Sequence, residues 1–136
     1  DGLDTYEGDI PLNDYLCLLR LADASGVPEV VRTRLQAWLL RTALRAVALD
    51  PSSWAGHALL PVQAAPTPEA LLALPLHTAV QASLDYVIER QEPDGTWSPG
   101  WSWFGAYPQD WPTAEREWRG VLTLERLRWL QHYGRL

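Results

Sequence analysis

The sequence predicts an all-α protein built from antiparallel helical hairpins. Four stretches repeat apolar residues at the 3.6-residue helical period, and each has a proline at or next to its start. None of them alternates apolar and polar residues with β-branched side chains, which is the pattern typical of strands. At 136 residues, 47% of them hydrophobic, the chain has the size of a single domain with its own core.

The first two helices are expected over residues 11–24 and 28–49. The middle of the first helix, residues 15–22, is apolar nearly all round, so we expect neighbours on several sides. Cys17, the only cysteine, should be a buried thiol there. The second helix carries two apolar stripes, which predict neighbours on both flanks: Val31, Leu35, Trp38, Leu39, Thr42, Ala46 and Leu49 in one, and Leu40, Leu44 and Val47 in the other.

Residues 50–75 are expected to form a long proline-rich connection. Five prolines and one glycine leave room only for a short helix at residues 68–74. A connection of this length is usually functional or packs on its own apolar residues. His57 lies in it without a second ligand nearby, so the sequence predicts no metal site there.

The third helix is expected over residues 76–90 and the fourth from Pro112 to the glycine stop at Gly134. One side of the third helix carries a polar ridge that should face water: His77, Gln81, Asp85 and Glu89. The apolar side of the fourth is expected to consist of Trp118, Val121, Leu122, Leu124, Leu127, Leu130 and Tyr133.

Charge and hydropathy restrict the partners and the location. The net charge is −6, and an acidic chain disfavours nucleic acid, whose phosphates bind clustered cations. No stretch approaches the ~20 apolar residues of a membrane helix, and no signal peptide is recognisable, so we expect a cytoplasmic protein. Residues 1–9 are expected to be an irregular entry, and the absence of methionine suggests a fragment of a longer protein.

A turn with a defined mechanism separates the third and fourth helices. Residues 91–97 spell Gln-Glu-Pro-Asp-Gly-Thr-Trp. Proline presets φ, Asp94 can bond its own backbone, and Gly95 tolerates a conformation that other residues avoid. Indoles follow Trp97 through the next loop and into the fourth helix, at Trp101, Trp103, Trp111 and Trp118.

This turn resembles the QW motif of the squalene-hopene cyclase and prenyltransferase superfamily of α/α toroids. The resemblance implies that Gln91 lies against Trp97 and ties its amide to the backbone at a neighbouring helix end, that Gly95 makes the tight turn, and that Trp97 is a buried lid. Its wider extent is residues 84–134. Toroids of this family close a ring of six hairpins. The two hairpins expected here should therefore expose flanks that missing upstream helices or self-association would cover.

The catalytic motifs of that superfamily are incomplete in this chain. The Asp-x-Asp-Asp element that protonates a polyene has no counterpart, since Asp1 and Asp4 have the wrong spacing. The Asp-x-Cys and Tyr-His pairs of the zinc enzymes correspond to Asp14-Tyr15-Leu16-Cys17 and His132-Tyr133, which are one residue too long and reversed. We therefore expect no zinc and no other cofactor.

Three functions stay open on the sequence. A terpene-cyclase-like or prenyltransferase-like module could hold an apolar, isoprenoid-like ligand on Trp101, Trp103, Trp111 and Trp118. A carbohydrate-active α/α enzyme domain would stack sugars on these indoles and use two acids for hydrolysis, the nearest candidates being Asp110, Glu115 and Glu117. The third function is an interaction scaffold.

Overall fold

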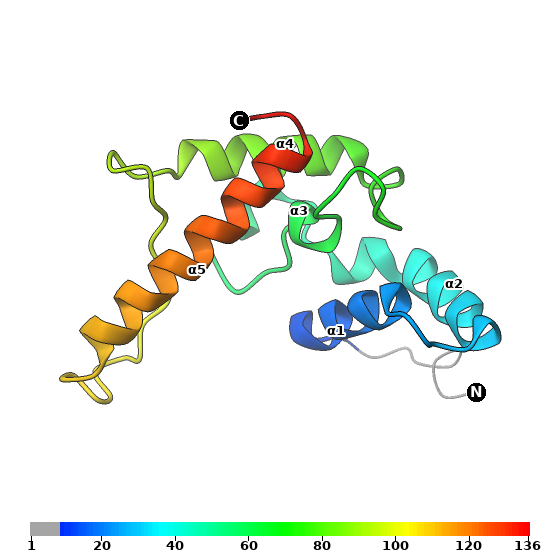
Figure 1. The fold of residues 1–136 in the computed structure, drawn as a ribbon, viewed down its shortest axis with the longest axis horizontal. Coiled ribbons are helices and arrows are strands. Elements are labelled where there is room, and N and C mark those ends of the chain that lie inside the picture. Colours follow the sequence, from blue (N-terminus) through cyan, green and yellow to red (C-terminus); the bar gives the residue numbers. More distant parts are fainter. Residues whose placement is uncertain (1–8) are drawn as a thin grey trace.

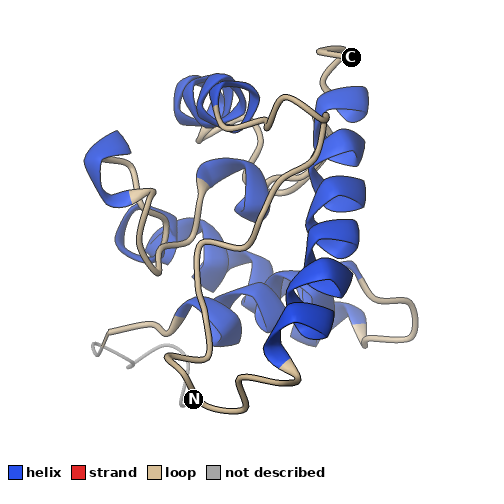
Figure 2. Cartoon of the chain, turned by 90° about the vertical axis from the view of Figure 1, so that its left-hand side faces the viewer, coloured by secondary structure: helices blue, strands red, loops and turns tan. Residues whose placement is uncertain are grey.

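The protein is all-α, as predicted. The computed structural model describes residues 9–136. This range contains five α-helices and no strand (Figure 1, Figure 2). Residues 1–8 lie outside the described part, and with them most of the predicted irregular entry. The helices are α1 (Leu12–Asp23), α2 (Glu29–Ala46), α3 (Pro61–Ala64), α4 (His77–Glu89) and α5 (Trp111–His132), with a 3-10 turn at Pro51–Ser53.

Helices α1 and α2 form the first hairpin. Tyr15, Leu19 and Ala22 recur at helical spacing and make the buried side of α1. The hydroxyl of Tyr15 donates to the carbonyl of Leu39 at 2.6 Å. Burial raises the pKa of Tyr15 to about 12, so this hydroxyl keeps its proton at physiological pH.

Two predictions about α1 are wrong: that it is enclosed on several sides, and that the thiol of Cys17 is buried. Cys17 is exposed, and Leu21 keeps 45% of its surface exposed. A helix advances about 100° per residue, so Cys17 lies about 200° around α1 from Tyr15. An apolar helix surface has to find a neighbour before it is buried, and among residues 9–136 α1 is covered mainly on the side of Tyr15, Leu19 and Ala22.

The described residues also cover α2 on one flank only. Leu35, Trp38 and Leu39 of the first stripe are buried. In the second stripe Val47 is buried, whereas Leu40 and Leu44 are 45% and 69% exposed. The prediction of neighbours on both flanks is therefore wrong for the part of the chain from residue 9 to residue 136.

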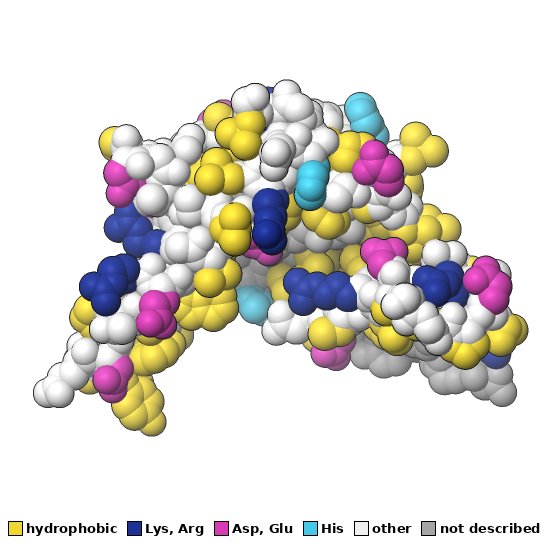
Figure 3. Space-filling model, in the orientation of Figure 1, with side chains coloured by type: hydrophobic (Ala, Val, Ile, Leu, Met, Phe, Trp, Pro, Cys, Tyr) yellow, Lys and Arg dark blue, Asp and Glu magenta, His cyan; other side chains and the backbone are white. Residues whose placement is uncertain are grey.

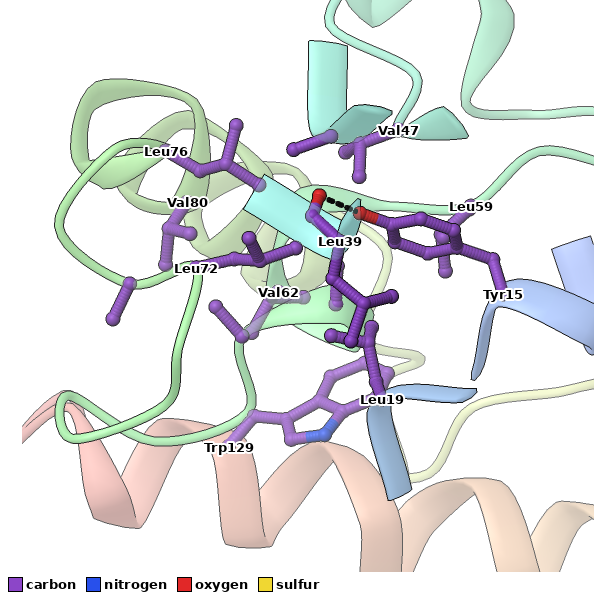
Figure 4. Close-up of a cluster of buried hydrophobic side chains, with 14 of the residues drawn as sticks. Tyr15, Leu19, Leu39, Val47, Leu59, Val62, Leu72, Leu76, Val80 and Trp129 are labelled. Carbon is purple, nitrogen blue, oxygen red and sulfur yellow. Dashed lines mark hydrogen bonds between the residues drawn. The ribbon is translucent and has the colours of Figure 1, made fainter. Parts of the chain in front are cut away.

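The long connection supplies the centre of the core. Its helix is α3, and the predicted position at residues 68–74 forms turns instead. Pro61 occupies the first turn of α3, and the Gln63 side chain accepts a hydrogen bond from the Leu60 backbone at 3.0 Å. The Val62 backbone donates to the Ser83 hydroxyl of α4 at 3.1 Å. Side chains of α2, the connection and α4 meet around α3, among them Leu39, Leu59, Val62, Leu72, Leu76 and Val80 (Figure 4).

Helix α5 rests on this core through its C-terminal half. Trp129 is 5% exposed and closes the core from the α5 side (Figure 4). The Tyr133 hydroxyl donates to the carbonyls of Ala65 and Thr67 at 2.7 and 3.0 Å. Arg135, near the C-terminus, bonds Asp85 and Gln81 of α4. Two of the four residues of the polar ridge that was expected to face water therefore bind another part of the chain. The N-terminal half of α5 extends beyond the other helices (Figure 1).

Candidate functional site

The turn after α4, residues 91–97, is held against the last turn of that helix by Trp97. Trp97 is 2% exposed, as expected, and its indole NH donates to the carbonyl of Val87 at 2.8 Å. Gly95 has φ +84, the conformation for which glycine is needed. The Gln91 amide donates to the Gly95 carbonyl at 2.9 Å. Gln91 thus bonds within its own turn, and the expectation that it ties a neighbouring helix end is wrong.

Arg119 of α5 fastens the turn to the next helix. Its Nη2 lies 3.1 Å from Glu92 Oε2, 2.9 Å from Asp94 Oδ2 and 2.6 Å from Thr96 Oγ1. Hydrogen bonds from the hydroxyl and backbone of Thr96, together with the charge of Arg119, lower the pKa of Asp94. This cluster could not be predicted from the sequence, because Arg119 is 27 residues from Glu92.

We expect Arg119→Met to lower the free energy of unfolding at neutral pH, because it leaves two carboxylates without their cation. A lowered pKa means that Asp94 contributes stability above its ordinary pKa of 3.8, and that this contribution is lost as the pH falls through the lowered value. The difference in the free energy of unfolding between wild type and variant should therefore shrink as the pH falls below 3.8. Urea unfolding at several pH values measures it, and a difference independent of pH would contradict the assignment.

The indole-rich segment forms a projecting surface that we call the aromatic arm, defined as loop residues 99–110 and α5 from Trp111 to Leu124. Its rings pair with one another rather than with the core. The Trp101 and Trp118 centroids are 5.4 Å apart in an edge-to-face arrangement. The Trp103 and Trp111 centroids are 5.3 Å apart and tilted, and Tyr107 lies edge-on to Trp103. An aromatic pair of this kind contributes about 0.5–1.5 kcal/mol of interaction free energy, which favours the observed ring positions.

The arm stays exposed in spite of these pairs. All side chains of residues 100–110 are exposed, and the tip residues Phe104 and Tyr107 are 93% and 70% accessible. Both have positive φ, 52° and 53°. Bulky residues rarely adopt this conformation, so the loop holds two large aromatics outward at a cost in backbone energy.

The exposure has a simple cause in α5. Leu122 and Trp129 lie on its buried side, and Trp111 and Trp118 continue that side toward the N-terminus at helical spacing. Within residues 9–136 the core ends before the helix does, and Val121 and Leu124, expected on the apolar side, are 55% and 52% exposed. Figure 3 shows hydrophobic side chains along the arm, facing the hollow that separates it from α1 and α2.

A cavity of about 120 Å³ lies between α1, α3 and α5. Its polar lining consists of Arg20, Asp23, Gln63 and Glu125, and Trp129 forms part of its apolar wall. Burial raises the pKa of Glu125, although the charges of Arg126 and Arg20 oppose this shift. None of the four candidate ligand-binding indoles lines this cavity. The sequence analysis missed it, because Arg20 and Glu125 come from opposite ends of the chain.

The acids suggested for hydrolysis are spread over the start of α5. Asp110 precedes the helix and makes no side-chain capping bond. Glu115 and Glu117 follow the first turn, in which α5 has no acid. Residues two apart on a helix point in directions about 200° apart, so these two carboxylates are poorly placed to flank one bond.

Two other kinds of site are absent from residues 9–136. No helix there is both long and apolar enough to cross a bilayer. No three His, Cys, Asp or Glu side chains of this part gather as a metal site would require. Comparisons with protein-family models, with curated proteins and with solved structures find no match.

Proposed function

We propose that this chain is a protein-interaction module, built from hairpins like those of α/α toroids, whose aromatic arm docks an amphipathic helix. The observation that carries the proposal is the apolar side of α5, which continues past the core and leaves Trp118 and Val121 about half exposed, together with the loop residue Trp101 that pairs with Trp118. Contiguous exposed apolar surface of this kind is typical of interaction sites. In a toroid, such a flank is covered by the next hairpin.

The composition of the arm supports docking. Tryptophan and tyrosine dominate the binding energy of protein interfaces, because each brings a large rigid surface with few rotatable bonds. The ring pairs of the arm and its positive-φ loop hold the rings in position before a partner arrives. Less conformational entropy is then lost on binding.

The arrangement favours a helix over the two other functions considered. An isoprenoid-like ligand needs a pocket that encloses most of its surface, and the indoles of the arm line no part of the cavity described above. A glycosidase needs two carboxyl groups on either side of one bond, which the spacing of Glu115 and Glu117 does not favour. A helix needs only an exposed apolar track, and α5 offers one.

Fluorescence polarisation with labelled helical peptides tests the proposal on the intact chain. We expect peptides with an apolar stripe to bind, and scrambled peptides of the same composition not to bind. Phe104→Asn/Tyr107→Asn should weaken binding at least about tenfold, since truncating an aromatic anchor costs more than about 1 kcal/mol. Leu74→Gln, at another exposed apolar residue that is 87% accessible, should bind as wild type does. Equal binding by all three proteins would refute the docking role of the arm.

A further inference from the structure

A second exposed apolar surface lies on α2. We call it the outer stripe: Val30, Thr33, Ala37, Leu40 and Leu44, which follow one another at steps of three or four residues. All five are exposed, Val30 and Leu44 by 69% each. Its middle residues, Thr33 and Ala37, are small, so a helix presenting this stripe offers space between its larger side chains for a projecting ring.

The outer stripe and the arm cannot cover each other within one chain. The first turns of α5 lie at one end of the long axis of the molecule, and α2 lies toward the other (Figure 1). The hollow between the α5 side and the α1–α2 side is visible in Figure 3. Each chain therefore presents one aromatic surface and one apolar helix, both without a cover in residues 9–136.

The charges beside the two surfaces are opposite in sign. Arg34, Arg41 and Arg45 are on α2. These arginines also interact within the chain, but a guanidinium has five N–H donors and can serve more than one acceptor. The acids of the arm, Asp110, Glu115 and Glu117, outnumber its two arginines, of which Arg119 is bonded to the 91–96 turn. Packing of the arm against α2 thus brings opposite charges together, whereas packing of two arms brings acids together.

We infer that the aromatic arm of one copy docks on the outer stripe of α2 of a second copy. The inference rests on the proposed function and names the helix that the arm receives. The contact joins two different surfaces, so each pair retains one free arm and one free stripe. Association then continues into a ring or an open chain instead of stopping at a two-fold dimer.

Analytical ultracentrifugation of two complementary variants tests the contact. Phe104→Asn/Tyr107→Asn removes the tip of the arm, and asparagine tolerates the positive φ of both positions. Leu40→Gln/Leu44→Gln replaces two apolar residues of the outer stripe by glutamine, a polar residue that favours helices.

Wild type and the control Leu74→Gln should associate beyond a dimer as the protein concentration rises. Each double variant alone should be a monomer, while their equimolar mixture should form a heterodimer through the one intact arm and the one intact stripe. Because all four substituted residues are exposed, thermal unfolding should confirm that both variants fold.

Several outcomes would overturn the inference. A wild type that remains monomeric while its arm binds helical peptides would remove self-association and keep the proposed function, whereas the loss of both would remove both. A stripe variant that still dimerises alone would show that the arms pack on each other. If a monomeric wild type instead sedimented with phosphatidylcholine vesicles, and the arm variant did not, the arm would belong to a lipid surface.

Discussion

Replacing Trp97 by alanine is expected to lower the free energy of unfolding by about 3–5 kcal/mol, the range for a buried tryptophan. Its ring is 2% exposed and belongs to the main core cluster. The substitution also removes the hydrogen bond to the Val87 carbonyl, which holds the turn against the last turn of α4. Chemical denaturation of the purified chain measures the loss.

Trp101→Ala is the matched control, because it removes the same side chain from a position that is 44% exposed. Its one ring pair, with Trp118, predicts a loss of about 1 kcal/mol or less. Similar losses in the two variants would contradict the division between a structural indole in the turn and displayed indoles on the arm.

Trp129→Ala should cost a similar amount, about 3–5 kcal/mol. Trp129 packs into the core from α5 and also forms part of the wall of the cavity beside Leu19, so the shortened side chain would enlarge a space that already exists. The loss should be concentrated in α5. Hydrogen exchange is therefore expected to show faster exchange of α5 amides, with α1 and α2 changed much less.

The outcome that would contradict this second prediction is uniform loss of protection across all helices at a small cost in stability. Trp118→Ala is the control on the same helix, since Trp118 is 42% exposed and outside the core cluster. It should leave the exchange of the C-terminal half of α5 unchanged.

The helices themselves could be predicted because their signals are local. Proline starts and the 3.6-residue period placed the four long helices within a few residues of their observed ends. Periodicity shows that a helix has an apolar side, but not whether a neighbour exists to cover it. That is why Cys17, Leu40 and Leu44 were assigned to covered positions and are exposed.

The candidate site was only half accessible to the same reasoning. The indoles of the arm could be singled out by their density, whereas their exposure depends on where the core ends along α5. The Arg119 cluster and the cavity beside Glu125 join segments that are distant in sequence. Local patterns in a single sequence do not indicate which distant segments come into contact. The burial of Trp97 was expected only from the resemblance of the turn to the QW motif, and the structure supplies its partner, the Val87 carbonyl.

The eight tryptophans fall into two equal groups. Trp38, Trp54, Trp97 and Trp129 are each at most 5% exposed, and the other four stand on the arm. Indole emission moves to shorter wavelength when water leaves the ring, and the first group is already dry. Any spectral shift on adding a partner would therefore originate mainly in the arm, which gives the unlabelled protein its own optical reporter of occupancy.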